Sequence, residues 1–357
     1  KTMSFTPDYV IHPGESLLEA LTDRSMTQSE LSIRTWLTEK HINQIINWKS
    51  PITPDTAILL QNALGISMTF WNNLQKSYDE TLARLEAEQR IQEELSLLWQ
   101  FKNCYKELVD KNILISVSTQ IEKYTQLINY FGVSSLLRIE KTEAIAYRKS
   151  TYKDIDVPTL SAWLRLGIKE ISATQLPEYD EKKLKQGIIK LRSLVSKPWS
   201  FWEDIKNTLH ECGVGVVFSP YFSRTYVNWA TRWIWKNPLI QVSIRGKSHD
   251  GLWFTLFHEL WHVLLHGKKD QFIEFENPDY DNNPQEKEAN DFASEILIHE
   301  EDYQLFIGTK IFDFDSILSF SHKISIDPGI VAWRLAKDWY ISRPIANRYR
   351  KQIALGK

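Results

Sequence analysis

The chain has 357 residues with 43 basic and 45 acidic side chains, and its formal net charge of −2 excludes a strongly basic protein that attracts nucleic acid through overall charge. Its composition, 43% hydrophobic and 25% charged, predicts a globular protein of two or three domains. The first residues lack the apolar core of a signal peptide, and no run is long enough to span a bilayer. Two distant cysteines, Cys104 and Cys212, indicate buried free thiols in a reducing compartment. We expect a cytoplasmic protein.

Short helical patterns separated by turn signals fill residues 14–80. Thr27 and Glu30 have the spacing of a capping box, which begins a helix. The pair Thr53-Pro54 is typical of another helix start, and Gly65 of its end. This segment therefore predicts a small all-α domain.

A longer amphipathic pattern follows at residues 69–112, where Leu, Ile and Trp recur at spacings of three and four between charged residues. It predicts one long helix, of which a plain connector or a dimerisation helix is the simplest interpretation. Shorter amphipathic patterns continue to about residue 196. We interpret residues 81–195 as a helical linker region.

Strand patterns first occur at residues 213–221 and 238–245, where apolar and β-branched residues are bounded by Gly or Pro. An apolar helix that ends at Gly267, a polar loop at residues 268–285 and a helix at 285–297 follow. The order predicts a multidomain protein with an all-α domain at 1–80, the linker, and an α+β domain at 196–357.

The segment His-Glu-Leu-Trp-His at residues 258–262 has the HExxH pattern. On a helix, residues four apart share a face, so His258 and His262 can direct ring nitrogens at one Zn²⁺ ion. Glu259 lies next to the first ligand, where a carboxylate can accept a proton from the attacking water and pass it to the leaving amine. The pattern predicts a zinc metallopeptidase, and its alternative is a surface helix that carries two histidines by chance.

A catalytic zinc ion needs a third protein ligand. His266 lies eight residues from His258, about 12 Å along a helix axis, which is too far for one straight helix to bring both to one ion. The next predicted helix offers Glu286 and Glu288. We prefer Glu288, because Phe292 and Ile296 then pack along the neighbouring helical positions, and Glu286 is the alternative.

The segments SHDGLWFTLFHELWHVLLHGKKD and EKEANDFASEILI resemble the ImmA/IrrE family of bacterial and phage metallopeptidases. The resemblance implies a zincin-like fold in which His258, His262 and Glu288 hold zinc and Glu259 is catalytic. His299 stands where that family usually has proline, at a helix end. Such enzymes cleave transcriptional repressors or antitoxin-like proteins at few sites.

The helices predicted at residues 26–37 and 38–49 have helix-turn-helix proportions without the usual glycine in the turn. Together with PITPDTA and the segment FWNNLQKSYD, they resemble HigA-type antitoxins, which are Xre-like repressors. In such a fold the second helix reads DNA bases, and the residue at the start of the first helix contacts a phosphate group. The resemblance implies DNA contacts by Gln28, Thr38, Glu39, Lys40, His41, Asn43 and Gln44.

These patterns lead to one hypothesis and one alternative. The hypothesis is a bacterial regulator that binds operator DNA, possesses a zinc-dependent endopeptidase domain, and cleaves a partner regulatory protein or itself. The alternative is a non-proteolytic antitoxin and repressor that binds a cognate toxin and uses the peptidase fold as a scaffold. A homodimer is compatible with both, and neither involves a membrane.

Overall fold

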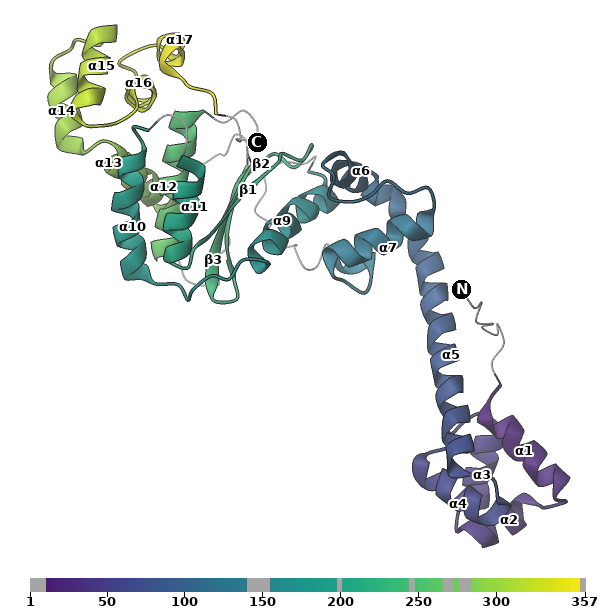
Figure 1. The fold of residues 1–357 in the computed structure, drawn as a ribbon. Helices are drawn as coiled ribbons and strands as arrows, with labels where there is room; N and C mark the ends of the chain where they lie inside the picture. The colour runs from purple at the N-terminus through teal and green to yellow at the C-terminus, as the bar shows by residue number, and fades with distance from the viewer. Residues whose placement is uncertain are drawn as a thin grey trace. The chain divides into compact units, whose positions relative to one another are not determined.

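The computed structural model describes residues 11–139, 155–197, 201–243, 248–265, 272–275 and 284–353 (Figure 1). The chain divides into two compact units, Lys1–Ser96 and Leu97–Lys357, which we describe separately. Among the described residues, no helix combines the length and the apolar character needed to cross a bilayer.

The described part of the first unit is entirely helical, as the sequence predicts. Its elements are α1 (Pro13–Asp23), α2 (Gln28–Thr35), α3 (Glu39–Ile46), α4 (Pro54–Leu64) and α5 (Met68–Leu95). Each begins after a residue whose side chain accepts a hydrogen bond from a backbone N–H of the first turn, which stabilises the helix start. These N-cap residues are His12, Thr27, Thr38, Thr53 and Ser67.

Apolar side chains from these helices form one core around the buried Trp71. Helix α1 approaches α3 closely at Gly14, where a Cβ atom would lie 2.1 Å from the carbonyl oxygen of Ile45. Only glycine allows this contact, which presses the first helix against the third.

The turn between α2 and α3 occupies residues 36–38. Trp36 takes the left-handed conformation there, with φ of 61°, which glycine usually supplies in such turns. Its side chain is 95% exposed. The missing glycine therefore does not prevent a helix-turn-helix arrangement.

A four-stranded sheet forms the centre of the second unit, with strand order β1-β3-β2-β4. Strand β3 pairs in parallel with β1, whereas β2 pairs antiparallel with both β3 and β4. The strands are β1 (Gly215–Ser219), β2 (Val227–Ile234), β3 (Asn237–Ser243) and β4 (Phe272–Phe275).

Helices cover both faces of this sheet (Figure 1). On one face, Ile171 of α9 (Val157–Ser172) packs against Val217 and Leu239. On the other face, Val216 and Phe218 belong to the main core. Alternate residues of β1 are therefore buried against different helices, which explains why the whole strand is apolar. The helices on the second face are α10 (Glu181–Leu194), α11 (Phe201–Glu211) and α12 (His249–Leu265).

The remaining helices of the second unit flank this centre. Before α9, the described residues form η1 (Leu98–Phe101), α6 (Lys102–Asp110), α7 (Gln120–Phe131) and η2 (Leu136–Arg138). After the sheet they form α13 (Pro284–Leu297), α14 (Glu300–Gly308), α15 (Phe314–Lys323), α16 (Pro328–Lys337), α17 (Arg343–Ala346) and η3 (Asn347–Tyr349).

The segment after η3 returns to the start of α12. The backbone N–H of His249 donates to the carbonyl oxygen of Lys351 at 2.9 Å, and the backbones of Ser248 and Gln352 form an antiparallel bridge. Arg350 also forms an ion pair with Asp250, with Nε and Oδ2 3.3 Å apart. We call these contacts between residues 248–250 and 350–352 the clasp.

Three elements differ from the predictions. The pattern at residues 69–112 is not one helix: α5 ends at Leu95, and the turn η1 lets Phe101 and Cys104 be buried in the second unit. Residues 97–195 belong to that unit and not to a separate linker, because Leu184 and Leu191 of α10 are part of its main core. The predicted loop at 268–285 contains the short strand β4.

Candidate metal centre

Helix α12 carries the HExxH segment and is almost completely buried. Leu256, Phe257 and Leu260 belong to the main core, so apolar packing fixes the helix against the sheet. The same helix holds His258 and His262 one turn apart. Both histidines are buried, with 7% and 2% of their surfaces exposed.

Three side chains bring metal-binding atoms together between α12 and α13. The Nε2 atoms of His258 and His262 lie 3.0 Å apart. One carboxylate oxygen of Glu286, on α13, lies 3.0 Å from the first of these atoms and 3.6 Å from the second. One ligand atom from each side chain falls within a group no wider than 4.8 Å. Two imidazole nitrogens and one carboxylate oxygen form the donor set of a catalytic zinc site.

The charge state of Glu286 suits a cation. Burial raises the pKa of its carboxyl group, but hydrogen bonds from His258 and His262 outweigh that effect and lower the pKa to about 2. The group is therefore ionised at neutral pH. Because it is buried beside the two imidazoles, its negative charge favours a positive charge in the space between the three side chains.

Asn290 orients the first histidine from the neighbouring helix. Its Oδ1 atom lies 3.0 Å from Nδ1 of His258. With the amide oxygen as acceptor, Nδ1 keeps a proton, so Nε2, which faces Glu286, is the ring nitrogen that would give up its proton to bind a cation. Asn290 is not part of the predicted site, although its position four residues after Glu286 places both on one helix face.

The preference for Glu288 as third ligand is corrected by this geometry. Glu288 is exposed, and the structure does not bring it to the two histidines. The buried side of α13 carries Glu286, Ala289, Ala293 and Leu297, spaced three or four residues apart. Residues two apart on a helix point in nearly opposite directions, so Glu286, the alternative, faces α12 and Glu288 faces solvent.

Glu259 is 2% exposed and directly follows the first histidine on α12. A carboxylate at this position, in a buried setting next to the donor set, suits the acceptance of a proton from water. His266, the histidine that helix geometry rules out as a ligand, lies outside the described residues.

In the first unit, the residues expected to contact DNA gather around α3. Thr38 is its N-cap, Glu39, Lys40 and Asn43 are exposed, and His41 and Gln44 are half-buried. Gln28, at the start of α2, accepts a hydrogen bond from the amide of Asn43 at 3.4 Å.

Asn47 adds a third amide side chain to the pair formed by Gln28 and Asn43. Asn47 donates from its side-chain amide to Oδ1 of Asn43 at 3.0 Å. The three amide groups of Gln28, Asn43 and Asn47 therefore form a row on the surface, which we call the amide row. Asn47 is not among the predicted DNA contacts, although it lies one turn after Asn43. Amide side chains are well suited to hydrogen-bond adenine bases in the major groove.

Two comparisons with known proteins find a match to part of this chain. A solved structure, titled as an addiction module antidote protein of a HigA family from Coxiella burnetii, is 34% identical; the match covers 24% of this chain and 92% of that chain, with a TM-score of 0.22. No curated protein matches this chain. Residues 219–315 match the Peptidase M78 family model, described as the IrrE N-terminal-like domain. That range contains His258, Glu259, His262 and Glu286, so the α+β part of the chain is similar to this family in the segment that carries the candidate metal centre.

Proposed function

We propose that this protein is a bacterial regulator of antitoxin type with a zinc-dependent endopeptidase domain, which cleaves a partner regulatory protein or itself. The buried cluster of His258, His262 and Glu286 supports this proposal most strongly. Its donor set matches that of catalytic zinc sites, and a fourth buried side chain, Glu259, is available as a base.

Each residue has a defined role in this proposal. His258, His262 and Glu286 would hold the ion, and Asn290 would keep the first imidazole in its binding orientation. Bound zinc would supply Lewis acidity that polarises the scissile carbonyl group and makes water more acidic. The carboxylate of Glu259 accepts a proton from the attacking water and transfers it to the nitrogen of the leaving amine, so that one peptide bond is hydrolysed.

The first unit provides the second part of the proposal, binding to operator DNA. Helix α3 presents polar residues at its N-terminal end, and the amide row runs along its exposed side. In the absence of DNA the amides of Gln28 and Asn43 bond to each other. On DNA they would exchange that bond for bonds to base edges or phosphate.

Metal content tests the proposed site directly. We expect elemental mass spectrometry to find about one zinc ion per chain in the wild type, as a three-residue catalytic site binds one ion. Glu286→Ala should lose most of it, whereas Glu288→Ala, two residues away on the exposed side, should retain it. A wild type that binds no zinc in excess metal would refute the metallopeptidase, and equal loss in both variants would refute the assignment of Glu286.

The variant Glu259→Gln separates proteolysis from a scaffold role. It should retain zinc, because Glu259 is not a ligand, but should generate no new peptide N-termini when expressed in the native host. N-terminal proteomics of cells expressing wild type or variant measures this. If both produce the same N-termini and the same regulatory effect, the non-proteolytic antitoxin and repressor would replace the peptidase.

A further inference from the structure

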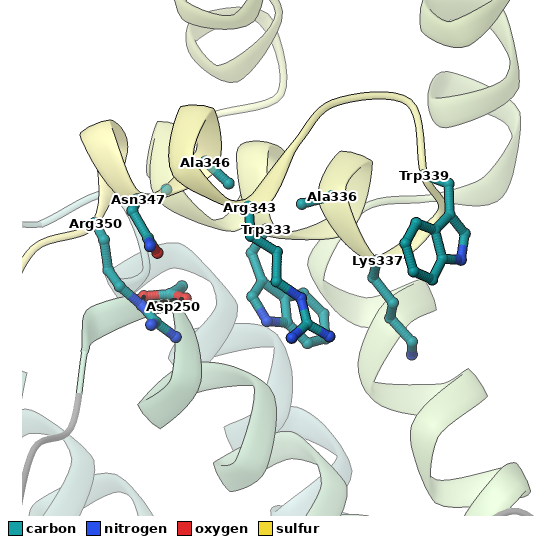
Figure 2. Close-up of a pocket in the computed structure, with 10 residues that line it drawn as sticks. Asp250, Trp333, Ala336, Lys337, Trp339, Arg343, Ala346, Asn347 and Arg350 are labelled. Atoms are coloured by element: carbon teal, nitrogen blue, oxygen red, sulfur yellow. Dashed lines mark hydrogen bonds and ion pairs between the residues drawn. The ribbon is translucent and has the colours of Figure 1, made fainter.

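A pocket of about 460 Å³ lies within the second unit, separate from the residues of the candidate metal centre. Its walls come from α16, α17 and η3, and the first turn of α12 contributes Asp250. Figure 2 shows Arg350 and Asp250 facing one another at one end, Lys337 and Trp339 at the other, and Trp333 and Arg343 between them. The volume is within the range of small-molecule sites.

The pocket has an excess of positive charge. Lys337, Arg343 and Arg350 line it, against the single carboxylate of Asp250. Asp250 is buried and forms an ion pair with Arg350, whose Nε atom is 3.3 Å from Oδ2. Within the part of the chain that the structure describes, no ion pair is found for Lys337 or Arg343. Lys337 lies over the rings of Phe254 and Trp333, which do not neutralise its charge, so both cations can still bind an anion. An arginine matches the oxygens of a phosphate group especially well.

Two indole rings line the same pocket. Trp339 is 88% exposed, so most of its ring is available for contact. Trp333 is half-buried, with the Nζ atom of Lys337 5.4 Å from the centre of its ring. Exposed indole rings provide flat apolar surfaces on which an aromatic ligand can stack, and nucleobases stack on tryptophan in this way. Asn347 adds an amide that can donate to and accept from the edge of a base.

We propose that this pocket binds a mononucleotide, with Arg343 and Lys337 on its phosphate groups and the base stacked on Trp339 or Trp333. Neither the two cations nor the indole rings require a mononucleotide by themselves, but a mononucleotide is the ligand that uses both. Inorganic phosphate would leave the indole rings unused, and an uncharged aromatic molecule would leave the cations without a partner. A nucleic-acid strand would extend beyond a pocket of this volume.

Isothermal titration calorimetry of the full chain with ADP, GDP, CDP and UDP, without added magnesium, tests the proposal. We expect at least one of these to bind with Kd at or below about 100 μM, equivalent to about −5.5 kcal/mol. Adenosine or inorganic phosphate alone should bind at least about tenfold more weakly, because each uses only half of the pocket.

Variants assign the binding to this pocket. Arg343→Gln and Trp339→Leu should each weaken the nucleotide by about tenfold or more, while both proteins keep the wild-type circular dichroism spectrum, since both side chains are exposed. The matched control is Arg348→Gln, which removes the same charge from an exposed residue of η3 that does not line the pocket. It should bind within about twofold of wild type.

Three results would overturn the proposal. The first is no heat of binding with any of the four nucleotides at about 1 mM. The second is nucleotide binding that Arg343→Gln and Trp339→Leu leave unchanged. The third is a single-stranded DNA decamer that binds at least about tenfold more tightly than the best nucleotide and depends on the same two residues, which would make this a nucleic-acid surface.

Discussion

The Nδ1 atom of His258 on α12 and the Oδ1 atom of Asn290 on α13 lie 3.0 Å apart, so one helix sets the ring orientation of a candidate metal ligand on the other. Partners of this kind fix the tautomer of the histidine and strengthen its binding to metal. The relationship gives Asn290 a positioning role that can be measured separately from catalysis.

Replacing Asn290 by leucine, which is similar in size, should lower zinc affinity about 10- to 100-fold. The reason is that the His258 ring loses its acceptor and can rotate or take the other tautomer. Competition with a chelating dye measures the affinity. Asp291→Ala, at the exposed neighbouring position, is the control and should bind zinc like wild type. Unchanged affinity in Asn290→Leu would exclude the positioning role.

The amide row predicts a loss of sequence-specific DNA binding in Asn43→Ala. With a duplex selected from a random pool, affinity should fall about tenfold or more, because a bidentate amide contact contributes about 1–3 kcal/mol of discrimination. Binding to unrelated DNA should change much less. Fluorescence anisotropy measures both, with Gln89→Ala, an exposed amide on α5, as the control. An equal loss on both DNAs would show that Asn43 does not read bases.

The close approach at Gly14 predicts that Gly14→Ala destabilises the first unit. A Cβ atom there would lie 2.1 Å from the carbonyl oxygen of Ile45, so α1 must move away from α3 at a cost of about 1–3 kcal/mol. Chemical denaturation followed by circular dichroism measures the free energy of unfolding. Gly308→Ala is the control, since a Cβ atom at Gly308 would meet no atom within 4 Å. A wild-type stability for Gly14→Ala would contradict the packing.

Ionisation of the Glu107 carboxyl group is expected to make the stability of the second unit depend on pH. Burial raises the pKa of its carboxyl group, but hydrogen bonds from Ser223 and Lys111 and the charge of Lys111 lower it more, so the net pKa is below its usual value. The ionised form therefore stabilises the fold above the ordinary pKa of about 4.5, and this contribution disappears as the pH falls through the folded pKa.

Glu107→Gln should accordingly reduce the free energy of unfolding by about 1–2 kcal/mol at pH 7 and have little effect near pH 3. Urea denaturation at several pH values measures the difference. Glu301→Gln changes an exposed carboxyl group of the same unit and is the control. A deficit for Glu107→Gln that is the same at both pH values would mean that shape, and not ionisation, matters at this position.

The sequence predicted the helix of the two candidate histidines but preferred Glu288 to Glu286, which the structure places beside them, for a physical reason. His258 and His262 are related by the periodicity of one helix, which is a local property. In α13 two stripes are partly apolar: Phe292 and Ile296 on one side, Ala293 and Leu297 on the other. The large side chains of the first stripe led to the preference for Glu288, and Phe292 does stack on Trp261 of α12. The fully buried stripe is the one with the small Ala289 and Ala293, and its glutamate, Glu286, is the one that meets the histidines.

The other features that the sequence did not predict also depend on contacts between residues far apart in the chain. Periodicity identified α10 as amphipathic, but what covers its apolar face depends on Phe201 and the sheet, which follow later in the chain. The strand β4 is only four residues long and was hidden in a polar segment. The pocket around Trp339 joins α16 and η3 to the start of α12, and a local pattern cannot show that these distant segments meet.

The clasp also affects when the second unit can finish folding. Asp250 and Arg350 are 100 residues apart in sequence, yet their pairing secures the start of the helix that carries the histidines. During synthesis, α12 must wait until residues 350–352 have left the ribosome, which takes about 5–20 s at usual elongation rates. Until then its apolar surface lacks part of its cover, so we expect nascent chains to depend on chaperones and to complete the candidate metal centre only late in translation.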